Sequence, residues 1–464
     1  MVGEQVSEHH PPIHPNSNMS KFIRIEWILL IALLARLTSL LLWGEHLQED
    51  RDGYLALAES LASGEGFQSV ASGEPTAYRP PLYPFVVAAL FKMGLSSRAL
   101  GGLHLGLGIL TVWLTFVLAK RLTTNPRIAF LAAGLVAVDP LLLRYTAFAM
   151  TETLFTFLLM LFLILQTTDS AGKMVGIRRQ FLSGIVFGLC ALCRPTIWAF
   201  GGLMMLVWGV QQVLRRVKTG PLENDVPLVT GRFQNVLAFT AGLLLIVAPW
   251  GIRNQLRFQK PIITTTHGGY TLLLGNNPVF YREVVEKSWG TVWQRESLLN
   301  WQENLAQDMK NHPEECANEA ACDRWLYRRA FGHIKSQPGM FLRACLLRFL
   351  RFWNIVPLQS DDHTVPGWMR WSVGTFYGLE VLLLFIGVSR VQGDVVRKLQ
   401  ILVVLLVSFT SVHLFYWSNT RMRAPLIPAI AILAAWGVEW LFNHSLRLVA
   451  YQSLQGKNDV GNVE

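Results

Sequence analysis

Long apolar runs constrain this chain more than any other feature of its sequence. The 464 residues include several runs of about 20 apolar residues, the length that crosses a bilayer core about 30 Å thick. The composition agrees, because 52% of the residues are hydrophobic and only 16% are charged, whereas a soluble domain carries about 25% charged residues. The sequence therefore predicts an all-α integral membrane protein with several crossings.

We expect about ten transmembrane helices. The first run has no small-residue cleavage site and is too long for the core of a signal peptide, so it is expected to be a retained anchor. The expected spans are 25–44, 97–119, 128–143, 150–167, 181–194, 196–213, 233–250, 368–388, 399–417 and 423–442.

The basic residues orient these spans. With the N-terminus in the cytoplasm, each alternate short loop carries its own cluster of Lys and Arg, as the positive-inside rule requires. This distribution accounts for the net charge of +10 without a nucleic-acid partner. We therefore expect a protein of the cell (inner) membrane with both termini in the cytoplasm. The clusters are Lys120, Arg121 and Arg127; Lys173, Arg178 and Arg179; Arg215, Arg216 and Lys218; and Arg390, Arg397 and Lys398.

This topology divides the chain into five parts. Within the first outer loop, 45–96, the segments "DGYLALAESLASG" and "PLYPFVVAALFKMG" suit amphipathic helices lying in the membrane interface. The N-terminal tail contains His9, His10 and His14, for which we prefer a disordered polar tail to a metal site. The expected parts are a cytoplasmic tail 1–24, a catalytic transmembrane module 25–251 including the outer loop, an outer (periplasmic) domain 252–367, C-terminal transmembrane helices 368–442 and a cytoplasmic tail 443–464.

Charged residues gather at the expected outer ends of the spans. Such residues are costly in a membrane and are therefore functional candidates. A carrier is expected to place them along a path at the midplane, but here we place only Arg36 in the middle of a span. The others are Asp50, Asp52, Arg79, Arg144, Glu152, Arg194, Arg253, Arg421 and Arg423.

Arginines and acids at one membrane face suit a particular reaction. Guanidinium groups bind phosphate oxygens bidentately and keep their charge. A carboxylate can take the proton of an incoming hydroxyl while fixed cations stabilise a departing phosphate. Displacement of a sugar from a lipid-linked phosphate needs both kinds of group.

At these residues the sequence resembles the GT-C class of membrane glycosyltransferases, and within it the branch of protein O-mannosyltransferases and bacterial aminoarabinose transferases. The resemblance implies a GT-C fold with interfacial helices and a small outer domain. It also implies inverting transfer of a sugar from a polyprenyl-phosphate donor to a glycan, lipid or protein acceptor in the cell envelope, such as lipopolysaccharide. The motifs that carry it are Asp50 four residues before Tyr54, "ALAESLASGEGF", "YRPPLYPFVVAALFKMG", "TETLF", "GLCALCRPT", "PWGIRNQLRF", "GGYTLLLGNNP" and "RMRAPLIP".

The same resemblance implies the site residues. Asp50 matches the catalytic carboxylate, with Asp52 as its rival, because the acid-rich "EDRD" departs from the family pattern. Arg79 is expected to contact the lipid phosphate. No compact carboxylate cluster other than Asp50-x-Asp52 is present, so we expect neither a metal nor another cofactor, although a divalent ion stays open. The remaining candidates on the donor side are Tyr54, Tyr83, Glu152, Arg194, Arg253 and Asn276.

Each candidate also has a structural interpretation. The acids of the first loop can be solvated, Glu152 can pair with Arg144 or Arg194, and Arg253 can cap the seventh span. Among the cysteines, Cys190 and Cys193 suit packing thiols, and a disulfide between Cys316 and Cys322 stays open.

The rival function is a carrier that moves lipid-linked saccharides without chemistry, but the sequence contains no convincing internal repeat. "GGYTLLLGNNP" also lacks the spacing of a phosphate-binding loop, so a nucleotide site is not expected.

Overall fold

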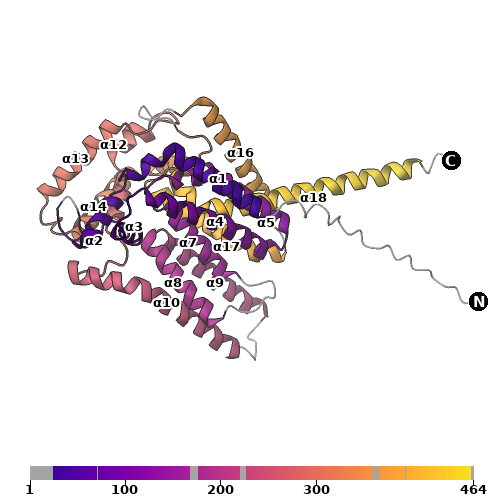
Figure 1. The fold of residues 1–464 in the computed structure, drawn as a ribbon, viewed down its shortest axis with the longest axis horizontal. Helices are drawn as coiled ribbons and strands as arrows, with labels where there is room; N and C mark the ends of the chain where they lie inside the picture. The colour runs from indigo at the N-terminus through magenta and orange to yellow at the C-terminus, as the bar shows by residue number, and fades with distance from the viewer. Residues whose placement is uncertain are drawn as a thin grey trace, which may run out of the picture.

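The computed structural model describes residues 25–69, 72–167, 176–219, 226–358, 365–391 and 393–460. Every regular element within these ranges is a helix, so the predicted all-α class is confirmed. Figure 1 shows α2, α13 and α14 gathered at one end of the molecule, while the last part of α18 projects from the opposite end. The expected tail 1–24 with its histidines, and Lys173 of the second basic cluster, lie outside the described residues.

Seven helices of the described chain are long and apolar enough to cross a membrane. An eighth crossing forms if α5 (Pro126–Val138) and α6 (Pro140–Thr146), which are bent by 50° relative to each other, count as one span. The protein is therefore a multi-pass membrane protein. The seven are α1 (Ile25–Trp43), α4 (Ala99–Thr123), α9 (Ile197–Thr219), α10 (Val226–Phe258), α16 (Gly367–Ser389), α17 (Asp394–Phe415) and α18 (Ile427–Val460).

Two of the ten expected spans form shorter helices. The segment 150–167 forms α7 (Glu152–Gln166) with 15 residues, and 181–194 forms α8 (Ile177–Cys193) with 17 residues. At 1.5 Å per residue, α7 is about 22 Å long, which is less than the ~30 Å of a bilayer core. Most of α7 is buried against other helices of the protein. Its apolar character thus reflects a position in the protein interior.

The remaining elements belong to the expected outer parts of the chain. The two segments of loop 45–96 that were expected to be helical both form helices, α2 and α3, while their position in the membrane interface stays a prediction. Helix α2 begins after Gly53, whose φ of 75° suits glycine. The described part of 252–367 is mostly helical, as expected. These elements are the short turn η2 (Gly44–Gln48), α2 (Tyr54–Ser63), α3 (Leu82–Lys92), α11 (Gly268–Gly275), α12 (Pro278–Phe280), η3 (Tyr281–Val285), α13 (Arg295–Asn311), α14 (Glu319–Ser336), α15 (Pro338–Phe352) and η4 (Thr420–Leu426).

Polar residues inside the spans are more numerous than the sequence analysis expected. Arg36 is buried in α1 and donates to the carbonyl oxygen of Ala137 at 3.1 Å, near the end of α5. Glu380 is also buried, in the middle of α16, so the expectation that Arg36 is the only charge in the middle of a span is wrong. One carboxylate hardly alters the apolar pattern of a 23-residue helix.

The cysteines follow the sequence analysis as far as the structure tests them. Cys190 and Cys193 are fully buried, as expected for packing thiols. The sulfur atoms of Cys316 and Cys322 lie 2.7 Å apart as free thiols, so a disulfide between them stays a prediction.

Glycines allow α16 and α18 to pack closely. A Cβ atom added to Gly387 would overlap the carbonyl oxygen of Leu433, and one added to Gly437 would overlap that of Leu383. Small residues at such contacts let helix backbones approach in membrane proteins. This pair of glycines therefore determines how closely the two helices pack.

We predict that Gly387→Val destabilises the protein. The added side chain must push α16 away from α18, and such overpacking costs about 1–3 kcal/mol. The measurement is the temperature at which the detergent-solubilised protein loses its monodisperse peak in size-exclusion chromatography. Gly378→Val on the same helix is the control, because a Cβ there meets only ordinary contacts. Equal behaviour of the two variants would contradict the prediction.

Candidate active site

The two aspartates between η2 and α2 have different surroundings. The carboxylate of Asp50 accepts hydrogen bonds from the backbone N–H groups of Leu55 at 3.0 Å and Ala56 at 2.8 Å. The first N–H groups of a helix have no partner within the helix, so Asp50 stabilises the start of α2. Both of its oxygens are used in this way.

Asp52 instead faces arginines. Its Oδ2 accepts a hydrogen bond from Nη2 of Arg421 at 2.5 Å, and its Oδ1 lies 3.9 Å from Nη2 of Arg79. Burial alone would raise the pKa of Asp52, but the charges of Arg421 and then Arg79 outweigh this effect and hold the pKa below its usual value. The side chain is 19% exposed, so a ligand can reach it.

Arg421 also links Asp52 to a second, fully buried acid. It donates hydrogen bonds to Glu152, which begins α7, and Nη1 of Arg194 donates to the same carboxylate at 3.0 Å. Of the two partners expected for Glu152, Arg194 is therefore present. Arg144 instead lies over the ring of Phe148, 5.6 Å from its centroid.

We call Asp52, Glu152, Arg79, Arg194 and Arg421 the arginine cluster. Three guanidinium groups meet two carboxylates, so the cluster has one surplus positive charge. The side chains of the three arginines are 12–22% exposed. Partly exposed guanidinium groups with a surplus charge can bind an anion such as a phosphate.

The cluster assembles residues that lie far apart in the sequence. They come from the loop before α2, the loop before α3, the start of α7, the end of α8 and η4. Arg421 thus comes from the C-terminal helices, outside the expected catalytic module 25–251.

His267 supports Arg79 from the segment just before α11. Nη1 of Arg79 lies 3.4 Å from Nε2 of His267. Arginine has no acceptor, so Nε2 of the histidine accepts this hydrogen bond and the ring is neutral. Burial, and secondarily the charge of Arg79, lower the pKa of His267 to about 3, which keeps it neutral. His267 is not among the residues predicted from the sequence, although it directly precedes the motif "GGYTLLLGNNP".

Tyr54 and Tyr83 lie beneath Arg79 and not at the rim of the cluster. Their rings pack edge to face with centroids 5.3 Å apart, and the guanidinium of Arg79 lies 5.6 Å from the Tyr54 centroid. The hydroxyl of Tyr83 is 3.3 Å from Nε2 of His104. Both tyrosines are buried, and burial raises the pKa of Tyr54 to about 12. They form an apolar support for Arg79.

Arg253 and Asn276 do not join the cluster. Arg253 donates hydrogen bonds of 2.7 Å to the carbonyl oxygens of Phe67 and Thr76, and so ties the first outer loop to α10. The side chain of Asn276 is fully buried; its amide donates to a backbone carbonyl at 2.9 Å and its oxygen accepts from Arg348 at 3.2 Å. The structure uses both residues to join segments of the backbone.

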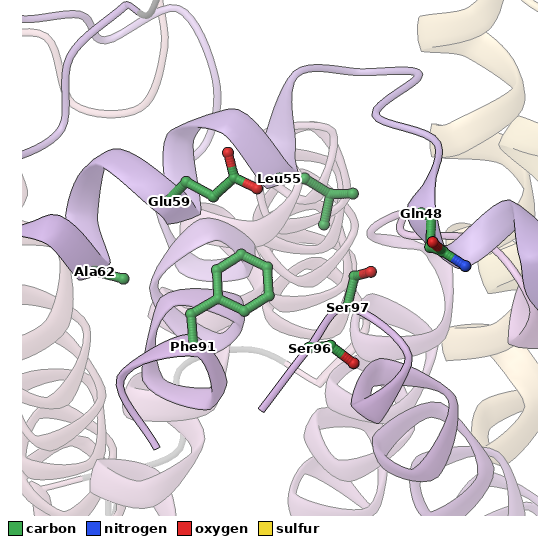
Figure 2. A pocket seen from close by; sticks show the side chains of 7 residues that line it. All are labelled: Gln48, Leu55, Glu59, Ala62, Phe91, Ser96 and Ser97. Carbon is green, nitrogen blue, oxygen red and sulfur yellow. The ribbon is translucent and has the colours of Figure 1, made fainter. Parts of the chain in front are cut away.

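A hollow of about 450 Å³ lies beside α2 (Figure 2). In Figure 2, Glu59 and Leu55 on α2 lie across the hollow from Phe91, Ser96 and Ser97. No residue of the arginine cluster lines it. The residues that line this hollow are Gln48, Leu55, Glu59, Ala62, Phe91, Ser96 and Ser97.

Within the described ranges no three His, Cys, Asp or Glu side chains come together as metal ligands.

No family model matches the chain. A protein of Aquifex aeolicus (strain VF5), described as uncharacterized, is 31% identical over 106 residues, which are 23% of this chain and about a fifth (21%) of that protein's length. Among solved structures, ArnT from Cupriavidus metallidurans bound to undecaprenyl phosphate is similar over 89% of this chain and 77% of its own, with 15% identity and a TM-score of 0.42. The oligosaccharyltransferase of Archaeoglobus fulgidus in its apo form is similar over 95% of this chain and 53% of its own, with 14% identity and a TM-score of 0.48.

Proposed function

We propose that this protein is an inverting membrane glycosyltransferase that uses a polyprenyl-phosphate sugar and acts at the outer face of the membrane. The observation that carries the proposal is Asp52, held between Arg421 and Arg79 in a cluster with a surplus positive charge. A proton acceptor and phosphate-binding groups thus lie side by side in a protein with membrane-spanning helices. The outer location rests on the distribution of Lys and Arg among the loops.

The reaction uses these groups in one displacement. An acceptor hydroxyl or amine attacks the anomeric carbon of the donor from the face opposite the phosphate. The new bond to the acceptor forms as the bond between the anomeric carbon and the phosphate oxygen breaks, and the acceptor proton passes to Asp52. Arg79 and Arg194 stabilise the negative charge that develops on the departing polyprenyl phosphate.

Donor binding prepares Asp52 for this role. In the free protein its carboxylate is paired with Arg421 and Arg79, which makes it a weak base. The phosphodiester of the donor competes with Asp52 for these guanidinium groups through its own negative charge and its two non-bridging oxygens. Asp52 is then released towards the acceptor, while the buried Glu152 keeps Arg421 and Arg194 in place.

The pH dependence of kcat/KM tests the pairing of Asp52 with the guanidinium groups that the phosphate is proposed to displace. Asp52 must be ionised to accept a proton, so kcat/KM falls at low pH as Asp52 becomes protonated. Removing a cation with Arg79→Gln raises the pKa of Asp52, and the acid limb of kcat/KM therefore moves to higher pH. The measurement is the initial rate of transfer between about pH 2 and pH 7, a range that includes the pH values below the usual pKa of an aspartate. Arg51→Gln is the control, because Arg51 pairs with Glu49 outside the cluster. An acid limb that stays in place in Arg79→Gln would contradict the proposed exchange.

The proposed reaction itself is tested in vesicles that contain the purified protein. A polyprenyl-phosphate sugar with a labelled sugar is supplied with a membrane extract as the source of acceptor. We expect free polyprenyl phosphate and a labelled glycoside of the opposite anomeric configuration, identified by NMR. Movement of the intact donor across the vesicle membrane without cleavage would instead establish the carrier function.

A further inference from the structure

A second hollow, of about 390 Å³, lies in the outer part of the chain and takes no part in the proposed reaction. It is formed by η3 and by the residues at the start of α13, at the end of the molecule that also carries α2 (Figure 1). One large aromatic ring lies among polar groups. The side chains used below are Glu283, Glu296, Ser297, Asn300, Trp301 and Asn304.

The carboxylate of Glu283 is held in a fixed position on the wall of this hollow. The hydroxyl of Ser297 donates to Glu283, and the indole N–H of Trp293 lies 3.3 Å from that hydroxyl oxygen. Nη2 of Arg282 donates to the other carboxylate oxygen at 3.3 Å. A polar group whose neighbours hold it in place is preorganised to bind a ligand.

A row of rings leads from the hollow to the arginine cluster. The centroid of Trp301 is 6.2 Å from that of Tyr270, and Tyr270 is stacked on His267 with centroids 5.4 Å apart. His267 in turn contacts Arg79 at 3.4 Å. The amide of Gln302 donates to the hydroxyl of Tyr270 at 2.6 Å and fixes its ring. The hollow and the cluster are therefore connected through packed side chains.

We infer that this hollow binds the saccharide part of the acceptor. An indole ring packs against the C–H face of a pyranose, while amide and carboxylate groups match neighbouring hydroxyls as donors and acceptors. With one arginine and two glutamates, the lining does not suit a phosphate. The polar helix α13 also suits water better than lipid. The assignment to the acceptor rests on the proposed function, whereas the binding of a saccharide does not.

The test uses the full-length protein in detergent micelles on a printed array of short neutral oligosaccharides and of peptides. We expect the protein to bind oligosaccharides, and Asn304→Ala to weaken this binding about five- to tenfold through the loss of one hydrogen-bonding group. Asn311→Ala is the matched control, because Asn311 is exposed at the end of the same helix and outside the hollow. Trp301→Ala should weaken binding further. Since Trp301 also packs in the protein interior, Glu296→Gln serves as a second exposed variant.

The outcomes separate this inference from the proposed function. Asp52→Asn should lose sugar transfer but still bind the oligosaccharides. Binding of no oligosaccharide, equal binding by wild type and Asn304→Ala, or binding of peptides alone would overturn the saccharide site even if transfer is intact. If the protein binds oligosaccharides through the hollow but cleaves no lipid-linked sugar, the saccharide site is supported and the proposed glycosyltransferase function is overturned.

Discussion

Asp52→Asn is expected to lower kcat for sugar transfer about 10²- to 10⁴-fold, the usual contribution of a general base. Asparagine has nearly the same shape, and its oxygen can still accept a hydrogen bond from Arg421. Its amide cannot take the acceptor proton at neutral pH. The measurement is a single-turnover rate with the polyprenyl-phosphate sugar, together with a thermal unfolding curve that shows the variant is folded.

Asp50→Asn is the matched control, because it makes the same substitution two residues away. Asparagine offers one acceptor oxygen where the carboxylate offers two to the start of α2. We expect this change to destabilise α2 by about 1 kcal/mol and to leave most of the transfer activity. An active Asp52→Asn variant with an inactive Asp50→Asn variant would move the role of base to Asp50, the residue that the family resemblance indicates.

The sequence alone could not decide which of these two aspartates faces the arginines. Both lie in one polar loop after an apolar run, and the motif spacing favoured Asp50. After both aspartates the chain turns into α2 at Gly53, which has a positive φ. Asp50 is left facing the N–H groups of α2, whereas Asp52 faces η4. A contact with Arg421, 369 residues further along the chain, cannot be inferred from local spacing.

The lack of information on long-range contacts in the sequence also explains which other predicted site residues and spans agree with the structure. Charge at the ends of apolar runs was enough to single out Arg79, Arg194 and Glu152, because such charges are costly in a membrane and therefore informative. Arg253 is also a charge at the end of an apolar run, yet its guanidinium donates hydrogen bonds to two backbone carbonyl oxygens. Apolar runs predicted the helices well. They could not distinguish α7, buried inside the protein, from a helix that contacts lipid, because both environments favour the same residues.

Arg421→Gln is expected to destabilise the protein severely and to abolish transfer. Glu152 is fully buried, and Arg421 is one of its two cationic partners. Removing one partner of a buried ion pair costs about 3–5 kcal/mol, because the remaining charge is poorly compensated. Transfer is lost as well, since the phosphate then loses one of the three guanidinium groups of the arginine cluster. Thermal unfolding in detergent and the single-turnover rate measure the two effects.

The double variant Glu152→Gln with Arg421→Gln separates the two effects. It removes the acid and its partner together, so no buried carboxylate is left poorly compensated, and a large part of the lost stability should return. The transfer rate should stay as low as in Arg421→Gln, because the guanidinium group is still missing beside Asp52. A double variant no more stable than Arg421→Gln would show that Glu152 is not the reason for the destabilisation. A double variant that regained transfer would show that Arg421 acts only by compensating Glu152 and has no role in binding the phosphate.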